Sequence, residues 1–116
     1  MIYSIILYTS WTVVFVSNWH VKMTETAEEE LKQLIAKGKI LKTDVKVILR
    51  WVDEMEEFGP EYISNSKEWH DHALDRNWTG YRSSAFSSSG RIIYRIIDND
   101  IIVEVHRVTA IHDYKK

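Results

Sequence analysis

The residue types that could do chemistry gather in the C-terminal part of this sequence. Four of the five histidines lie between residues 68 and 116, among several arginines. These residues are His70, His72, His106 and His112, with Arg76, Arg82, Arg91, Arg95 and Arg107. Histidine exchanges protons near neutral pH, and the planar guanidinium of arginine matches phosphate. Such a set suits cleavage of an RNA phosphodiester by its own 2′-hydroxyl, which needs a base, an acid and a cation, and needs no metal.

Strand alternation gives a first idea of how these residues are arranged. Arg82 and Arg91 fall on two neighbouring predicted strands, and alternation places them near each other. Residues 112–116 read His-Asp-Tyr-Lys-Lys and follow the last predicted strand. If this tail folds back along the sheet, His112 and Tyr114 approach Arg91. The sequence therefore predicts a site built from the sheet and the C-terminal tail.

Plainer roles account for the same residues and stay open at this point. A histidine after a strand is more often a hydrogen-bonded surface residue than a catalyst. Arg82 and Arg91 would equally serve as solvent-facing sheet residues, paired with Glu104. The His70-x-His72 pair has no third ligand at a telling spacing, so we expect no metal site.

Hydrophobic periodicity indicates the helices that support these residues. Residues 19–23 alternate as a half-buried strand does. Thr24 or Thr26 then opens a helix that Gly38 closes, and Thr26 with Glu29 has the spacing of a capping box. A second helix is predicted over Thr43–Phe58 and ends at Gly59-Pro60. The apolar face predicted for it comprises Val45, Ile48, Leu49, Val52 and Met55.

The second half of the chain reads mainly as strands. Residues 61–77 are expected to be irregular, and three strands follow at Trp78–Phe86, Arg91–Ile97 and Ile101–Val108. Residues 98–100, Asp-Asn-Asp, join the last two as a tight hairpin. The predicted fold is α+β, with an N-terminal strand and a helical hairpin packed on a mainly antiparallel sheet of about four strands.

Composition limits the possible functions. A chain of 116 residues is expected to form one domain. It has no cysteine, which excludes disulfide scaffolds, thiolate metal sites and thiol nucleophiles. The formal net charge is −2, whereas nucleic-acid binders are usually basic. The charge is uneven, because residues 23–76 hold eight Lys/Arg against thirteen Asp/Glu, and residues 77–116 hold six against four. The excess of positive charge therefore lies where the predicted site lies.

The N-terminal segment stands apart in composition. The first sixteen residues carry no charge and are rich in β-branched and aromatic side chains. They lack the basic start of a signal peptide and, with Ser4, Thr9, Ser10 and Thr12, are too polar and short for a spanning helix of about 20 apolar residues. We expect residues 1–18 to be an extension, with an added strand as the favoured structure, and residues 19–116 to be the main domain.

Several motifs now suggest a known family. Residues 71–82 read Asp-His-Ala-Leu-x-x-Asn-Trp-x-Gly-Tyr-Arg, which resembles the start of the sheet in the RelE/ParE toxin superfamily, particularly its YafQ-like branch. Residues 90–96, Gly-Arg-Ile-Ile-Tyr-Arg-Ile, resemble the family's next strand. The ending at residues 112–114, His-Asp-Tyr, is similar to its C-terminal tip. The order and spacing of the motifs agree over residues 19–116.

The resemblance implies a function and partners. Proteins of this superfamily are toxins of bacterial type II toxin–antitoxin pairs, and many cleave mRNA in the ribosomal A site. It therefore implies a cytoplasmic, metal-independent endoribonuclease with no cofactor and no membrane association. Its partners would be a cognate antitoxin, mRNA and the ribosome. Alternatives are a ParE-like toxin that inhibits DNA gyrase without chemistry of its own, and an inactive member that only binds an antitoxin.

The resemblance also implies roles for individual residues. Arg91 would stabilise the phosphate, His112 would transfer a proton, and Tyr114 would position or stack a base. The RNA contacts would come from Arg82, His72, Arg95, Lys115 and Lys116.

The sequence departs from the family at several site positions. Ala85 stands where the YafQ-like branch has another active-site histidine, Ser89 where it has an acidic residue, and Ser84 where the RelE branch has a second lysine. The set Arg91, His112 and Tyr114 is closer to the YoeB type, in which a glutamate is the base. Glu68 and Glu104 are the two positions considered for that glutamate.

Overall fold

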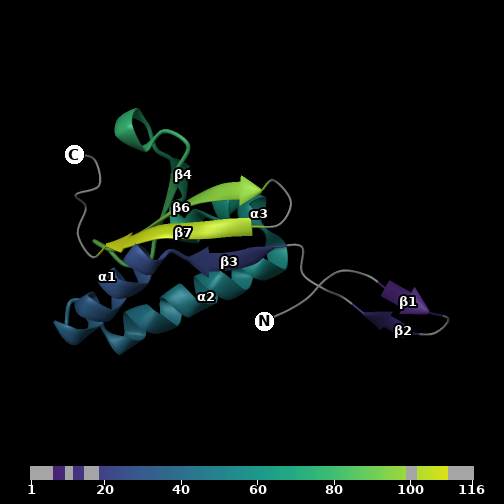
Figure 1. The fold of residues 1–116 in the computed structure, drawn as a ribbon, viewed down its shortest axis with the longest axis horizontal. Coiled ribbons are helices and arrows are strands. Elements are labelled where there is room, and N and C mark those ends of the chain that lie inside the picture. The colour runs from purple at the N-terminus through teal and green to yellow at the C-terminus, as the bar shows by residue number, and fades with distance from the viewer. Residues whose placement is uncertain (1–6, 10–11, 15–18, 99–101, 110–116) are drawn as a thin grey trace.

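The structure is a computed structural model that describes residues 7–9, 12–14, 19–98 and 102–109. A five-stranded sheet with the order β3-β7-β6-β5-β4 forms the centre of the fold (Figure 1). Its strands are β3 (His20–Met23), β4 (His72–Ala73), β5 (Arg82–Ala85), β6 (Arg91–Asp98) and β7 (Ile102–Thr109). The pair β3–β7 is parallel and the other pairs are antiparallel. The predicted α+β class is confirmed, and the sheet gains a fifth strand because two-residue β4 pairs with β5.

Two long helices form the second layer beside this sheet (Figure 1). They are α1 (Glu25–Ala36) and α2 (Lys42–Phe58). Thr24 is extended and its Oγ1 accepts a hydrogen bond from the Ala27 N–H at 3.1 Å, so Thr24 is the N-cap of α1. Of the two threonines expected to open this helix, Thr24 is confirmed. The capping box of Thr26 with Glu29 is wrong, because the helix has already begun at Glu25 and Thr26 lies inside its first turn.

Helix α2 packs on the sheet through a face slightly different from the predicted one. Ile48, Trp51 and Met55 are buried, at the three- and four-residue spacing of one helix face. Leu49 is 57% exposed, so its predicted place in the core is wrong. One step along a helix rotates a side chain by about 100°, which carries Leu49 away from the face that Ile48 defines.

The core is centred on aromatic side chains from both layers. Trp51 of α2 meets Tyr94 of β6 edge to face, with ring centroids 5.3 Å apart. Trp69 and Ile63 are also buried in this cluster. Ile92, Ile93 and Tyr94 of the central strand β6 are all buried. The register of β6 with β7 shifts between Ile93 and Tyr94, where β7 holds one extra residue.

The segment between α2 and β5 is more regular than expected. Gly59 takes φ +91 and ends α2, and a Cβ there would lie 2.7 Å from Trp19 Nε1. The chain then forms α3 (Pro60–Asn65), a 3₁₀ turn η1 (Lys67–Trp69), β4, and a second 3₁₀ turn η2 (Arg76–Trp78). The expectation of an irregular segment is therefore wrong in part. The strand predicted from Trp78 begins only at Arg82, because η2 ends at Trp78 and a turn follows it, with the Tyr81 N–H donating to the Trp78 carbonyl oxygen.

The N-terminal segment contains two short strands, β1 (Leu7–Thr9) and β2 (Thr12–Val14). They pair antiparallel with each other and form a sheet separate from the five-stranded one. The boundary between an extension and the main domain near residue 18 stays a prediction. No helix in the described part of the chain is long and apolar enough to cross a membrane.

Candidate functional site

The two arginines expected to lie together are separated in the sheet. Arg82 is opposite Tyr94, whereas Arg91 is opposite Ala85. The two arginines are therefore three residue pairs apart along β5 and β6, roughly 10 Å, and alternation puts them on opposite faces. The prediction that they are neighbours is wrong, because the long turn between β5 and β6 sets a register that sequence alone does not show.

Arg91 is held at the mouth of that turn. Its Nη1 donates to the carbonyl oxygens of Gly90 at 2.8 Å and Ser87 at 3.2 Å. The turn is braced in addition by Gly90 N–H, which donates to Ser87 Oγ at 2.8 Å, and by Phe86 N–H, which donates to Gly90 O at 3.1 Å. One nitrogen of the guanidinium thus fixes the side chain, and the remaining N–H groups keep the fork that suits a phosphate.

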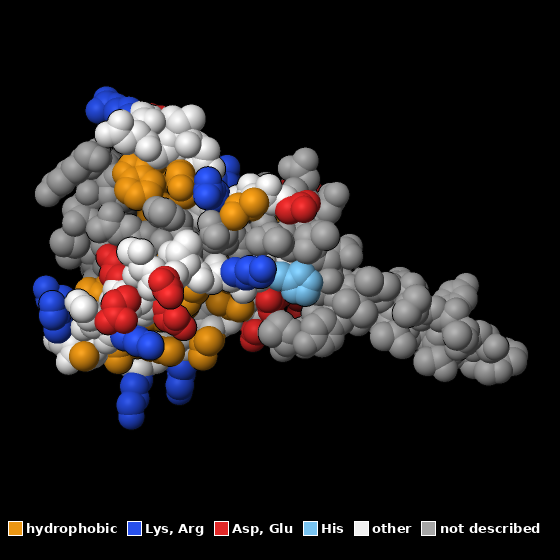
Figure 2. Space-filling view, in the orientation of Figure 1, with side chains coloured by type: hydrophobic (Ala, Val, Ile, Leu, Met, Phe, Trp, Pro, Cys, Tyr) orange, Lys and Arg blue, Asp and Glu red, His pale blue; other side chains and the backbone are white. Residues whose placement is uncertain are grey.

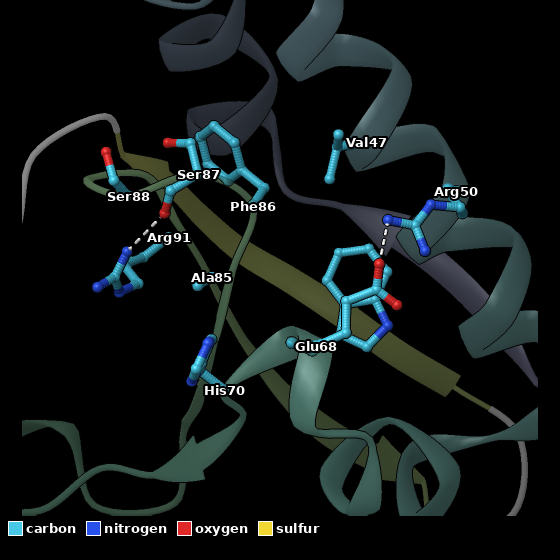
Figure 3. Close-up of a pocket in the computed structure, with 10 residues that line it drawn as sticks. Val47, Arg50, Glu68, His70, Ala85, Phe86, Ser87, Ser88 and Arg91 are labelled. Carbon is cyan, nitrogen blue, oxygen red and sulfur yellow. Dashed lines mark hydrogen bonds and ion pairs between the residues drawn. The ribbon is translucent and has the colours of Figure 1, made fainter.

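Arg91 lines a pocket of about 550 Å³ (Figure 3). The pocket lies between α2, η1 and the turn that follows β5. Its lining residues are Val47, Arg50, Glu68, Trp69, His70, Ala85, Phe86, Ser87, Ser88 and Arg91. Cationic, acidic and imidazole side chains from three separate segments of the sequence therefore line one cavity.

The α2 side of the pocket is an ion-pair cluster centred on Arg50. Its Nη2 lies 2.5 Å from Glu68 Oε2, its Nη1 lies 3.3 Å from Glu54 Oε2, and its guanidinium lies 4.8 Å from the centre of the Trp69 ring. The hydrogen bond from Arg50 lowers the pKa of the Glu68 carboxyl and raises the pKa of Arg50. Glu68 was one of two positions considered for a catalytic carboxylate, and in the structure this pairing weakens it as a base.

A second polar cluster surrounds Asp71, whose side chain is fully buried. Its Oδ1 accepts from Arg82 Nε at 2.7 Å and lies 2.7 Å from Arg82 Nη2. Its Oδ2 accepts from Ser84 Oγ at 2.5 Å and from the Tyr94 hydroxyl at 2.6 Å. We call Asp71, Arg82, Ser84 and Tyr94 the Asp71 clamp. It binds the segment before β4 to both β5 and β6.

The clamp changes the electrostatics of its members. Burial and the adjacent Asp71 charge raise the pKa of the Tyr94 hydroxyl well above its ordinary value. Burial opposes the charged form of Arg82, but the hydrogen bond and charge of Asp71 outweigh it and raise the pKa of Arg82. The Arg82 guanidinium is therefore paired with a buried carboxylate, which weakens its attraction for an RNA phosphate.

The other predicted site residues lie away from this pocket or outside the described residues. His72 is exposed on β4, with Nδ1 3.1 Å from the His70 carbonyl oxygen. Arg95 is exposed on β6, with its guanidinium 5.4 Å from the centre of the Tyr81 ring. Residues outside the described ranges include His112, Tyr114, Lys115 and Lys116. No group of three potential metal ligands occurs in the described part of the chain, so nothing there completes the His70–His72 pair.

Sequence reasoning missed His70 and Arg50 as pocket residues. His70 takes a left-handed conformation, with φ 46 and ψ 43, as it closes η1. Histidine is among the non-glycine residues enriched in that conformation, but nothing in the local sequence marks the position. Arg50 reads as an ordinary exposed residue of an amphipathic helix, and its pairing with Glu68 bridges eighteen positions of sequence.

Comparisons with known proteins bear on the fold. No protein-family model matches the chain, and no curated protein matches it. Among solved structures, a point mutant of YafQ from E. coli aligns with a TM-score of 0.59 at 15% identity, covering 76% of this chain and 88% of that one. The YoeB–YefM complex from Staphylococcus aureus gives 0.59 at 20% identity, covering 78% and 94%.

A third solved structure aligns with this chain over a similar length. The YoeB/ParE toxin from Agrobacterium tumefaciens aligns with a TM-score of 0.59 at 14% identity, covering 80% of this chain and 98% of that one. These proteins are toxins with the RelE/ParE-like fold. The predicted resemblance is thus confirmed at the level of the fold: this chain has the RelE/ParE-like toxin fold.

Proposed function

We propose that this chain is the toxin of a type II toxin–antitoxin pair and that it cleaves mRNA on the ribosome without a metal ion. The observation that carries the proposal is Arg91, anchored by the turn between β5 and β6 and lining a pocket in a toxin fold. An anchored guanidinium stabilises a phosphorane well, because its donors need no reorganisation when negative charge develops. Solved complexes of toxins with this fold, DinJ–YafQ and YoeB–YefM, support an antitoxin as the partner.

In this mechanism the RNA supplies its own nucleophile. The 2′-oxygen attacks the phosphorus, the bond to the 5′-oxygen breaks, and a 2′,3′-cyclic phosphate and a 5′-hydroxyl result. Arg91 stabilises the phosphorane, His112 transfers a proton and Tyr114 orients the scissile nucleotide. Further RNA contacts are assigned to Arg82, His72, Arg95, Lys115 and Lys116.

The charge distribution favours a substrate presented by a partner. Figure 2 shows acidic and basic side chains intermixed over the described residues of one face, rather than a continuous basic area. Phosphate contacts supply most of the salt-dependent affinity for nucleic acid. With a net charge of −2 the chain is expected to bind free RNA weakly. The ribosome would therefore hold the mRNA and this protein would supply the cleaving groups.

Expression in bacteria, with and without Arg91→Gln, tests the proposal. Wild type is expected to arrest growth, and primer extension should show new 5′-hydroxyl ends within translated mRNA. Loss of one charge-stabilising donor set costs on the order of 10²–10³-fold in rate, so Arg91→Gln should relieve the arrest. Arg76→Gln is the matched control, since Arg76 is exposed outside the pocket. Intact mRNA during arrest, with inhibition of supercoiling by purified gyrase, would instead support the gyrase alternative.

A further inference from the structure

His70 presents its imidazole to the same pocket as Arg91. Both residues line the pocket, and Figure 3 shows the His70 ring directed toward Ala85 and the Arg91 side of it. Ala85 contributes only a methyl group at this point, which leaves space between the ring and the guanidinium. His70 is exposed, and its ring has no hydrogen-bond partner within the part of the chain that the structure describes. The imidazole is therefore open to a ligand.

The backbone on both sides of His70 is anchored. Trp69 is buried and its Nε1 donates to Glu54 Oε1 at 2.8 Å, while Asp71 is held by the Asp71 clamp. The His70 N–H donates to Lys67 O at 3.3 Å, and its carbonyl oxygen accepts from His72 Nδ1 at 3.1 Å. A left-handed residue between two fixed neighbours has little freedom of direction. The fold therefore fixes the direction in which the His70 Cα–Cβ bond leaves the backbone.

Other charged groups of the pocket are less suited to taking a proton. Arg50 and Arg91 are cations, and Glu68 is bound to Arg50. Asp71 follows His70 in the chain but does not line the pocket, and its carboxylate is bound by the donors of the clamp. His70 is thus the described pocket residue whose side-chain type accepts a proton near neutral pH.

We propose that His70 is the general base of the Arg91 pocket and removes the proton from the attacking 2′-hydroxyl. This inference rests on the proposed ribonuclease function and adds a residue to it. The 2′-hydroxyl proton passes to the imidazole as the 2′-oxygen bonds to phosphorus. The 5′-oxygen leaves and takes a proton from a separate acid, the role assigned to His112. The imidazolium of His70 then returns its proton to water.

The substitution His70→Asn separates chemistry from structure. Asparagine also tolerates the left-handed conformation, so the turn after η1 should survive and the melting temperature should stay that of wild type. His20→Asn is the control, because His20 is exposed on β3 and does not line the pocket. On mRNA in translating ribosomes, His70→Asn should cleave on the order of 10²–10⁴-fold more slowly, and His20→Asn at the wild-type rate. The acidic limb of the wild-type pH–rate profile should disappear in His70→Asn.

A modified substrate distinguishes a base from an acid. Sulfur in place of the scissile 5′-oxygen leaves without needing a proton, because thiols are far more acidic than alcohols. His70→Asn should remain slow on this RNA, as the 2′-hydroxyl still needs a base. Recovery of the wild-type rate would mean that His70 is not the base. Equal rates and pH profiles for His70→Asn and wild type would overturn the inference while leaving the ribonuclease standing. Absence of cleavage by wild type would overturn both proposals.

Discussion

Replacing Asp71 perturbs a carboxylate that joins three segments of the chain. Its side chain is fully buried and accepts hydrogen bonds from Arg82, Ser84 and Tyr94. Asp71→Ala removes the acceptor and leaves a guanidinium and two hydroxyls facing a small void. Asp71→Asn keeps the shape and removes the charge. The Ser84 and Tyr94 hydroxyls can rotate to accept from the new amide, so part of the network survives.

The cost follows from how deeply each partner is buried. Removing one member of a buried ion pair costs about 3–5 kcal/mol. The Arg82 side chain is 31% exposed, so water recovers part of the lost interaction and the lower end applies. We expect Asp71→Ala to lower the free energy of unfolding by about 3 kcal/mol, and Asp71→Asn to lower it by about half as much.

Urea unfolding at pH 7 measures these differences. The midpoint should fall in the order wild type, Asp71→Asn, Asp71→Ala, with the slope m unchanged. Asp53→Ala, on the exposed side of α2, is the control and should stay within about 0.5 kcal/mol of wild type. A decrease of less than about 1 kcal/mol in the free energy of unfolding of Asp71→Ala would refute the reasoning, because removing one member of a buried ion pair should cost more.

Two further predictions concern the same region. The raised pKa of Tyr94 means that its neutral form stabilises the fold fully below the unfolded pKa near 10, and that this contribution is lost as the pH rises above 10. Urea midpoints from pH 8 to 11 should therefore fall more steeply for wild type than for Tyr94→Phe; parallel curves would contradict the assignment. Gly90→Ala places a Cβ against the Phe86 ring, closer than van der Waals contact allows, and should destabilise the protein by about 1–3 kcal/mol, with a lower calorimetric melting temperature. An unchanged melting temperature would show that the Phe86 ring moves aside freely.

Local sequence signals predicted the secondary elements that depend on periodicity. Both long helices and strands β3, β6 and β7 occur near their expected positions. Element boundaries were less well determined: the sequence offered Thr24 and Thr26 as starts of α1, and the structure selects Thr24. The short elements α3, η1, β4 and η2 carry little periodic pattern, so they were expected to be irregular.

Much less of the candidate site could be predicted from the sequence. Arg91 was identified from its residue type and from the family resemblance, and the structure adds the turn that holds it. The prediction that Arg82 lies beside Arg91 was wrong, because one step in strand register reverses the face of every side chain. The roles assigned to His112 and Tyr114 stay predictions.

The sequence by itself determined which residue types are available and which layers they form, because periodicity and composition act over a few residues at a time. Only the tertiary structure decided which of them meet. Tyr94 donates a hydrogen bond to Asp71, twenty-three positions away in the sequence, and Arg50 forms an ion pair with Glu68, eighteen positions away. Such contacts depend on how helices and strands pack against each other, which no local pattern encodes. The place of His70 beside Arg91 is a consequence of that packing.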